Sequence, residues 1–561
     1  MESQEEVYTQ DSNALKIRMA MLAPFLIAIA AWWLYTQAIV PQPYYVNADP
    51  EIPYLMSSLS VFKGEPYTFI DHPGTPIEII GSAILGATYP FVAKIADSFT
   101  LAHVLHPETF LFIARTLLVL MSMGTMVLLV RYTVPGDHWT DGLAAVAVAI
   151  LYFSIHPRGF ASIVHWSHNS FSFPLGTLLG LGIFYLVVYK KGGTTAQIVL
   201  LGFSLGVLTA VQLYFLTWVV AAILALGTYN LLSDRGWKRA LISSVQIGVS
   251  ALGGFVVATL PIINRYPEFL SWIIRVGTHQ GRHGSGPPGF LSLETAVANF
   301  IALWGELRLL FIFMGLLIGV VVVMVILQRR SIKTNAGLWA VALGIIVQVG
   351  LMSVLVIKHP GVIYMQAVAA ALPLLLAVVF SLMHFSGSHK GSFDRLVKFG
   401  ISILIFAIFA FALTRSITIH DAETKHVGSA VEEINTYLDD FAREQGLDRP
   451  SLTTLGIYGM PLECQALWYG NQYADYTLAD EISSICSRDL IYDLWENRVV
   501  LADGSSVPLD QSEWDVIVAY EAALIDFPYL AEIGKVVYSE TRLGTFGRIV
   551  YVHPAQESMG D

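Results

Sequence analysis

The stretch LLFIFMGLLIGVVVVMVIL, residues 309–327, contains only apolar residues and glycines. A helix needs about 20 mostly apolar residues to cross the roughly 30 Å hydrocarbon core of a membrane. Ten further runs of this kind occur at residues 20–40, 109–130, 141–157, 171–189, 196–212, 214–232, 240–263, 336–357, 361–383 and 398–414. The sequence therefore predicts a multi-pass α-helical membrane protein with about eleven transmembrane helices.

The composition agrees with these runs. Of 561 residues, 55% are hydrophobic and 13% are charged, whereas roughly a quarter of an ordinary soluble protein is charged. The mean hydropathy is +0.60. These values exclude a soluble enzyme, a disordered scaffold and a coiled coil.

The net charge of −11 conceals two unlike parts. Residues 415–561 carry 9 Lys or Arg against 25 Asp or Glu, a net charge of −16, while residues 1–414 carry 23 against 18 and are weakly basic at +5. Neither part has the basic stripe that phosphate backbones require, so nucleic acid is not an expected partner.

Basic residues beside the predicted spans give the orientation. With a cytoplasmic N-terminus, one side receives 14 of the 23 basic residues of the first 414: Lys16, Arg18, Arg131, Lys190, Lys191, Arg235, Lys238, Arg239, Arg329, Arg330, Lys333, Lys390, Arg395 and Lys398. An odd number of spans then places the acidic tail outside. The protein is therefore expected in the plasma (inner) membrane, with its tail in the periplasm or extracellular space. The segments 77–96 and 293–307 carry charges and are predicted to lie in the interface rather than to span.

This topology predicts three parts. Residues 1–19 form a cytoplasmic tail, residues 20–414 a transmembrane domain with a first external loop at 41–76, and residues 415–561 a small external α/β domain. In the last part, 430–445 has helical spacing and is stopped by Gly446. Short strands are predicted at 452–458, 514–520, 535–538 and 548–552. Cys464 and Cys486 are either a disulfide or two buried thiols.

The first external loop, PQPYYVNADPEIPYLMSSLSVFKGEPYTFIDHPGTP at 41–76, concentrates the acids Asp49, Glu51 and Asp71. A carboxylate at the membrane surface can act as a general base on a hydroxyl, or two can hold a divalent cation. A solvated loop with ordinary acids is the alternative.

The second external turn is SIHPRGFASIVHWSHNSF, 154–171. It places Arg158, His168 and Asn169 beside aromatic rings, which suits a polar ligand such as a sugar. The alternative is an interfacial aromatic belt.

The third and fourth loops carry cations. RVGTHQGRHGSGPPGF at 275–290 contains Arg275, His279, Arg282 and His283 before a glycine- and proline-rich run, and favours an interfacial phosphate. KHPGVIYMQ at 358–366 starts with Lys358, and Pro373 is expected to interrupt the span that follows. Contact with lipid headgroups is the alternative for both loops. Four polar loops on one face favour a single composite site.

On these motifs the chain resembles membrane-embedded glycosyltransferases of the GT-C superfamily, in the branch of protein O-mannosyltransferases and aminoarabinose transferases. The resemblance rests on Asp49 and Glu51 just after the first span, on Asp71-His72-Pro73, and on Lys358 with Tyr364 before a late span. It covers about residues 15–414 as an order of spans and loops.

The resemblance implies transfer of a sugar from a polyprenyl-phosphate donor to a glycan, lipid or protein acceptor on the outer face, usually with inversion. Asp49 would be the general base, with Glu51 and Asp71 as further catalytic acids. The cations Arg275, His279, Arg282, His283 and Lys358 would hold the donor phosphate, and His72, Arg158, His168, Asn169 and Tyr364 would bind substrate.

Two other functions stay open at this point. A transporter or flippase of lipid-linked saccharides would place charges near the bilayer midplane and often shows inverted repeats, and neither feature is seen here. A metal-dependent oligosaccharyltransferase-like enzyme would use Asp49 and Glu51 as ligands of Mg²⁺ or Mn²⁺. The glycosyltransferase that the resemblance implies requires no cofactor.

Overall fold

The structure is a computed structural model. It describes residues 12–67, 70, 74–92, 98–280, 287–385, 391–457, 462–486, 489–493, 498–501, 505–521, 524, 532, 534–542 and 548–554. The chain forms two compact units. Unit 1 comprises Met1–Leu34, Ile70–Pro76 and Arg115–Ile417, and unit 2 comprises Tyr35–Phe69, Ile77–Ala114 and Thr418–Asp561.

Helices account for most of the chain. Those that lie in or enter unit 1 are α2 (Ser12–Leu34), α6 (Pro107–Tyr132), α7 (Trp139–Ile155), α8 (Gly159–Ser162), α9 (Leu178–Phe184), α10 (Thr195–Val211), α11 (Leu216–Leu232), α12 (Gly236–Thr259), α13 (Tyr266–Thr278), α14 (Leu293–Leu327), α15 (Ala336–Lys358), α16 (Gln366–Phe385) and α17 (Gly391–Glu444). Those of unit 2 are α3 (Ala48–Phe62), α4 (Thr75–Val92), α5 (Phe99–Leu105), α18 (Glu463–Gln472) and α19 (Ala479–Ser483).

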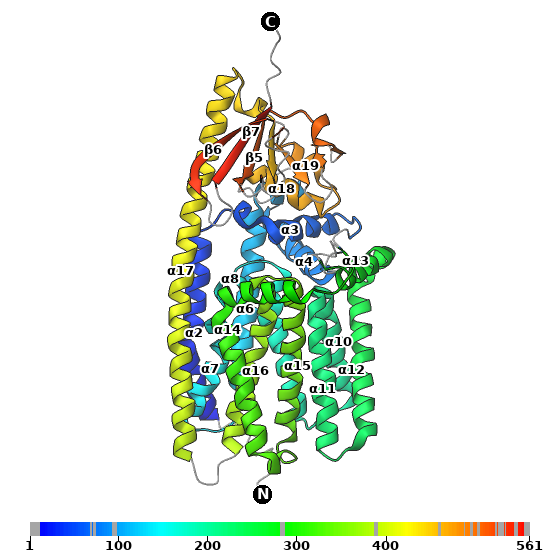
Figure 1. Ribbon diagram of the computed structural model, residues 1–561, viewed down its shortest axis with the longest axis vertical. Coiled ribbons are helices and arrows are strands. Elements are labelled where there is room, and N and C mark those ends of the chain that lie inside the picture. Colours follow the sequence, from blue (N-terminus) through cyan, green and yellow to red (C-terminus); the bar gives the residue numbers. More distant parts are fainter. Residues whose placement is uncertain are drawn as a thin grey trace. The chain divides into compact units, whose positions relative to one another are not determined.

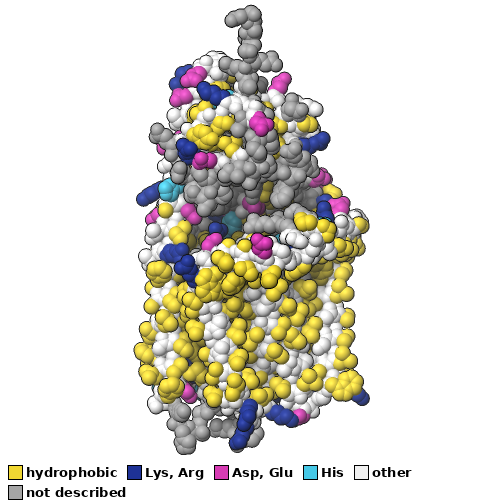
Figure 2. All heavy atoms as spheres, viewed as in Figure 1, with side chains coloured by type: hydrophobic (Ala, Val, Ile, Leu, Met, Phe, Trp, Pro, Cys, Tyr) yellow, Lys and Arg dark blue, Asp and Glu magenta, His cyan; other side chains and the backbone are white. Residues whose placement is uncertain are grey.

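The long helices of unit 1 are suited to a membrane. Helices α10, α11, α12, α15 and α16 run side by side (Figure 1). Large apolar side chains such as Leu200, Val249 and Leu343 are exposed on them, and Figure 2 shows hydrophobic side chains covering their outer sides. Because such surfaces are stable in lipid and costly in water, the chain is an integral membrane protein.

The number of spans differs from the predicted eleven. Within the described residues, 9 helices are long and apolar enough to cross a membrane. Two other predicted runs are the apolar helices α7 and α10 of 17 residues each, which are shorter than the about 20 residues that usually cross the hydrocarbon core. The count of eleven stays a prediction.

Two local expectations have structural outcomes. Helix α14 has non-helical backbone at Leu307 (φ −115°, ψ 23°), which divides it at the predicted boundary between 293–307 and the span.

The expectation that Pro373 interrupts its helix is wrong, because α16 continues from Gln366 to Phe385. The Thr177 hydroxyl donates to the Ala370 carbonyl beside this proline at 2.8 Å. Neighbouring hydroxyls of this kind let membrane helices tolerate proline.

Unit 2 contains a seven-stranded sheet of order β4-β3-β2-β1-β5-β7-β6. Its strands are β1 (Thr454–Ile457), β2 (Asp489–Asp493), β3 (Arg498–Val500), β4 (Ser506–Val507), β5 (Val516–Tyr520), β6 (Gly534–Arg542) and β7 (Arg548–Pro554). Strand β1 pairs parallel with β2 and β5, and the other pairs are antiparallel. The predicted small α/β domain is confirmed, although β2, β3 and β4 were not predicted.

The end of α17 covers one face of this sheet. Ala430, Ile434 and Leu438, spaced four residues apart, pack with Val516, Val518, Ile549 and Tyr551. The alternate residues of the strands, including Leu455, Ile517 and Val550, form the core on the other face. Gly446, at φ +68°, follows the helix in the left-handed conformation that glycine adopts at helix ends.

The units differ from the predicted division of the chain. Helix α17 crosses the predicted boundary at 414/415 without a break, and the units divide between Ile417 and Thr418. Most of the first external loop, predicted as part of the transmembrane domain, belongs to unit 2 together with the tail. This difference arises because α3 packs on α18, more than 400 residues later.

Arg18 and Lys398 of unit 1, which the sequence analysis used only as part of the basic bias of one side, are buried together with Asp141. Lys398 Nζ lies 2.6 Å from Asp141 Oδ1, with 3% and 7% of the two side chains exposed. The Arg18 guanidinium donates to the carbonyls of Val134 (2.7 Å) and Gly136. These groups therefore hold α2, α7 and α17 together.

Candidate functional site

The acids of the first external loop lie in different environments within unit 2. Asp49 has non-helical backbone (φ −89°, ψ 123°) and precedes the regular turns of α3, and its side chain is exposed. Glu51, in the first turn, is fully buried. Of the two acids, only Asp49 is accessible from the surface. Four other predicted site residues, Asp71, His72, Arg282 and His283, lie outside the described residues.

Lys358 joins the third and fourth loops of unit 1. Its ammonium donates to the carbonyls of Val276 (2.5 Å) and Gly277 (3.1 Å) in the last turn of α13. It also lies 4.4 Å from the centroid of the Phe290 ring. The side chain is buried. A cation at a helix C-terminus satisfies orphan carbonyls and interacts favourably with the helix dipole, and the two carbonyls named here use two of the three N–H donors of the ammonium.

The chain after α13 folds back on itself. His279 forms a backbone bridge with Pro288, and the Gly289 amide donates to the Thr278 carbonyl at 2.6 Å. Arg275, one turn before the end of α13, is exposed, and His279 is half-buried. Arg275 and His279 thus stand at the C-terminal end of α13, where the Lys358 ammonium binds the backbone.

A network of amide, phenol and hydroxyl groups occupies the second external turn. The Asn169 amide donates to His168 Nε2 at 2.9 Å, and the Tyr214 hydroxyl donates to Asn169 Oδ1 at 3.0 Å. The hydroxyls of Ser172 and Tyr214 are 3.0 Å apart. His168 and Asn169 are buried, whereas Arg158 is exposed. The structure thus places the predicted pair His168 and Asn169 in a bonded network and leaves Arg158 at the surface.

The second and fourth loops also meet. His156 Nε2 donates to the Val362 carbonyl at 3.1 Å. Tyr364 lies half-buried on the same short turn. Three of the four predicted polar loops therefore meet within unit 1.

Sequence reasoning missed three aromatic residues of this region. Tyr152 stacks on Phe173, with ring centroids 4.7 Å apart, and lies parallel to the His156 ring at 6.1 Å. Tyr214 completes the Asn169 network, and Phe290 faces Lys358. These rings resemble an ordinary aromatic belt in the sequence, so only their hydrogen-bond and cation partners distinguish them.

Glu78, in the first turn of α4, is a buried acid that the sequence placed in the interface. Its side chain is fully buried, and neither carboxylate oxygen has a hydrogen-bond partner among the described residues. Burial raises the pKa of Glu78 well above its usual range. It also raises the pKa of the nearby Tyr67 phenol, with a smaller contribution from Glu78.

We expect Glu78→Gln to stabilise the protein at pH 7.5 by a few degrees in melting temperature. An unfolded Glu ionises above about pH 4.3. Since folding raises the pKa of Glu78, the native chain must take up a proton there, and stability falls as pH rises from the unfolded pKa to the folded one. The gain should vanish near pH 4.

Thermal unfolding in detergent across this pH range, with the exposed Glu108→Gln as control, measures the effect. Destabilisation of Glu78→Gln at every pH would contradict it.

The described residues do not form an evident metal centre. They contain no group of three or more His, Cys, Asp or Glu side chains placed to hold a metal ion. Glu51 is buried while Asp49 is exposed, so these two carboxylates differ in their access to a hydrated cation.

The comparisons with known proteins give a likeness among solved structures. The chain matches no family model and no curated protein. Among solved structures, it is similar to the crystal structure of ArnT from Cupriavidus metallidurans bound to undecaprenyl phosphate. The identity is 13% and the TM-score 0.47, over 96% of this chain and 98% of that chain. The undecaprenyl phosphate in that crystal is bound to ArnT.

Proposed function

We propose that this integral membrane protein is a glycosyltransferase of the GT-C type. It moves a sugar from a polyprenyl-phosphate donor to a hydroxyl of a glycan, lipid or protein on the external face of the plasma (inner) membrane. The observation that carries the proposal is the meeting of three polar loops in unit 1. There the Lys358 ammonium of the fourth loop donates to a carbonyl of the third loop, and His156 of the second loop donates to the Val362 carbonyl of the fourth.

The acceptor hydroxyl must lose its proton as its oxygen attacks the anomeric carbon. Asp49 is the proposed general base, because its carboxylate is exposed. A general base contributes about 10² to 10⁴ in rate. Attack from the side opposite the phosphate breaks the bond between the anomeric carbon and the phosphate oxygen, and it inverts the configuration at that carbon.

The leaving phosphate gains negative charge in this step. Arg275, His279 and Lys358 are the described cations proposed to stabilise it, with Arg282 and His283 on the same loop. Fixed positive charge aimed at a developing anion is a large contribution to such reactions. The Tyr152, His168, Asn169 and Tyr364 side chains are proposed to contact the sugar, since rings and amides bind its faces and hydroxyls.

No step of this mechanism passes through a metal ion. Mg²⁺ or Mn²⁺ held by Asp49 and Glu51 remains the alternative. Loss of activity on addition of a chelator distinguishes this metal-dependent mechanism from the metal-free one. Asp71 is proposed as a further catalytic acid beside Asp49.

An external location for unit 2 is part of the proposal. Cys464 and Cys486 form a disulfide, with an S–S distance of 2.02 Å. Disulfides persist in oxidising compartments such as the periplasm and are rare in the cytosol. The basic bias of the opposite loops supports the same orientation.

The proposal is tested on Lys358. In a transfer assay with a labelled polyprenyl-phosphate sugar, Lys358→Met should weaken donor use by about 1 to 3 kcal/mol, the range for a hydrogen bond to a charged group. Lys358→Arg should retain most activity. Lys333→Met, which removes an exposed ion pair with Asp234, is the control. Loss of melting temperature with unchanged donor use would mean that Lys358 only caps α13.

A further inference from the structure

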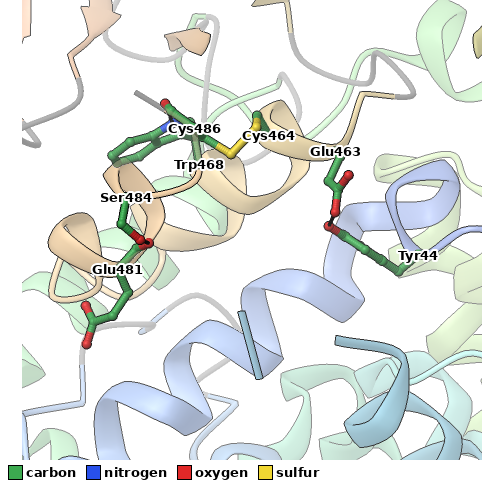
Figure 3. The surroundings of a disulfide bond; sticks show 7 residues. All are labelled: Tyr44, Glu463, Cys464, Trp468, Glu481, Ser484 and Cys486. Carbon is green, nitrogen blue, oxygen red and sulfur yellow. Dashed lines mark hydrogen bonds between the residues drawn. A yellow bond between two sulfur atoms is a disulfide. The ribbon is translucent and has the colours of Figure 1, made fainter. Parts of the chain in front are cut away.

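The tail segment Glu463–Cys486, here called the disulfide-closed segment, contacts the acid-bearing part of the first external loop within unit 2. It contains α18 and α19, and its ends are joined by the disulfide between Cys464 and Cys486. Helix α18 packs along α3. Figure 3 shows the disulfide on the same side of α18 as Trp468, whose indole donates to the Cys486 carbonyl at 3.4 Å.

Polar contacts tie this segment to the chain before and after α3. On the N-terminal side, the Tyr44 hydroxyl donates to Glu463 Oε1 at 3.0 Å (Figure 3). Tyr44 is buried, and this burial together with the Glu463 carboxylate raises the pKa of the phenol. At the C-terminal side, Lys63 Nζ donates to the Thr477 carbonyl at 3.2 Å and to Glu481 Oε1 at 3.1 Å.

Two further bonds lie between these ends. The Ser57 hydroxyl donates to the Tyr473 carbonyl at 3.0 Å, and the Thr477 hydroxyl donates to Ser60 Oγ at 2.9 Å. The contacts therefore follow α3 over its length. A helix of fifteen residues is marginal by itself in water, so α3 depends on this packing.

Gly470 allows the close approach of the two helices. A Cβ placed on it would lie 2.6 Å from Ile52 Cγ2, 2.9 Å from Met56 Cγ and 3.0 Å from the Ile52 carbonyl carbon. Ile52 is three residues after Asp49. A larger residue at position 470 therefore requires Ile52 and Met56 of α3 to shift relative to α18.

We propose that the disulfide-closed segment is a positioning element for the catalytic acid: it holds the first turn of α3, and thereby Asp49, in the geometry that turnover requires. The proposal rests on the proposed function and gives the acidic tail a role in it. Gly470, Lys63 and Glu481 are positioning residues. A displacement of about 1 Å in a reacting group can cost roughly a hundredfold in rate.

The first experiment compares Gly470→Ala with Gly428→Ala. Gly428 lies on α17 in the same unit, and a Cβ there meets nothing within 4 Å. We expect Gly470→Ala to raise hydrogen exchange of the α3 amides and to lower kcat by about tenfold to a hundredfold, with the donor KM unchanged. Gly428→Ala should change neither.

The second experiment exchanges charges. Lys63→Glu should loosen α3 and lower kcat, because it faces Glu481 with a like charge. The double variant Lys63→Glu, Glu481→Lys should restore both measurements. Rescue by the exchanged pair is not expected if either residue serves only as a surface charge.

The third experiment reduces the disulfide. Dithiothreitol breaks the Sγ–Sγ bond by donating two electrons and two protons, yields two thiols, and is itself oxidised to a cyclic disulfide. Since Cys464 and Cys486 are the two cysteines of the chain, the treatment is specific within it. We expect reduction to lower kcat, and the variant Cys464→Ser, Cys486→Ser to be insensitive to dithiothreitol.

The possible outcomes separate this proposal from the proposed function. Unchanged α3 exchange in Gly470→Ala would overturn the positioning role, and so would loosened α3 with unchanged kcat. A native protein without transferase activity would instead overturn the proposed function, while the exchange measurements still report whether the segment holds α3.

Discussion

Asp49→Asn is expected to abolish nearly all transfer while leaving a folded protein that binds donor. Asparagine keeps the size and hydrogen bonding of the side chain but cannot accept the acceptor's proton. Loss of a general base typically lowers the rate by about 10² to 10⁴. Because Asp49 is exposed and precedes the regular part of α3, the change should not disturb packing. Turnover with saturating donor and acceptor is the measurement.

Matched controls accompany this variant. Glu65→Gln changes an exposed acid in the same loop and should retain activity. Glu51→Gln and Asp71→Asn should be less damaging than Asp49→Asn. Activity that survives chelation supports a plain base, whereas its loss with rescue by Mg²⁺ or Mn²⁺ makes Asp49 and Glu51 metal ligands. Full activity of purified Asp49→Asn would exclude both.

Lys398→Met is expected to destabilise unit 1 by about 3 to 5 kcal/mol, the usual cost of removing one partner of a buried ion pair. The pair is almost completely buried, with 2.6 Å between Lys398 Nζ and Asp141 Oδ1. The variant leaves the Asp141 carboxylate without this partner. Unfolding in detergent, followed by heat or denaturant, measures the loss.

The Lys333–Asp234 pair provides the control, since its side chains are 71% and 73% exposed. Lys333→Met should cost about 0 to 1 kcal/mol. The double variant Lys398→Met, Asp141→Leu should recover part of the stability, because it removes both charges of the pair while Arg18 keeps its bonds to the Val134 and Gly136 carbonyls. Equal losses of unfolding free energy in Lys398→Met and Lys333→Met would show that burial does not set the stability that the Lys398–Asp141 pair contributes.

Much of the fold was readable from local patterns. The long apolar runs predicted the membrane helices, and the β-branched segments of the acidic tail predicted the small α/β domain. Hydropathy and strand propensity are local properties of each segment, so the sequence shows them directly. The break in α14 at Leu307 was anticipated from Glu294 and Glu306, whose charges are costly inside a bilayer. Strands β3 and β4, of three and two residues, are too short to give a period-two pattern.

The candidate site was readable only as a list of residue types at span ends. The sequence named Lys358, Arg275, His168 and Asn169, but not the carbonyls of α13 that Lys358 binds or the Tyr214 hydroxyl beside Asn169. Such partners are decided by contacts between residues far apart in the chain, and no local pattern records them.

The sequence by itself determined that this chain enters a membrane and which residues stand at the ends of its spans, since hydropathy and charge are properties of each segment alone. The tertiary structure decided which of those charges are buried. It exposed Asp49 and buried Glu51 and Glu78, and it paired Lys398 with Asp141. It also placed the disulfide-closed segment on α3, through contacts that span more than 400 residues of sequence. Burial and pairing depend on what the rest of the fold brings close, and this sets the cost of each charge.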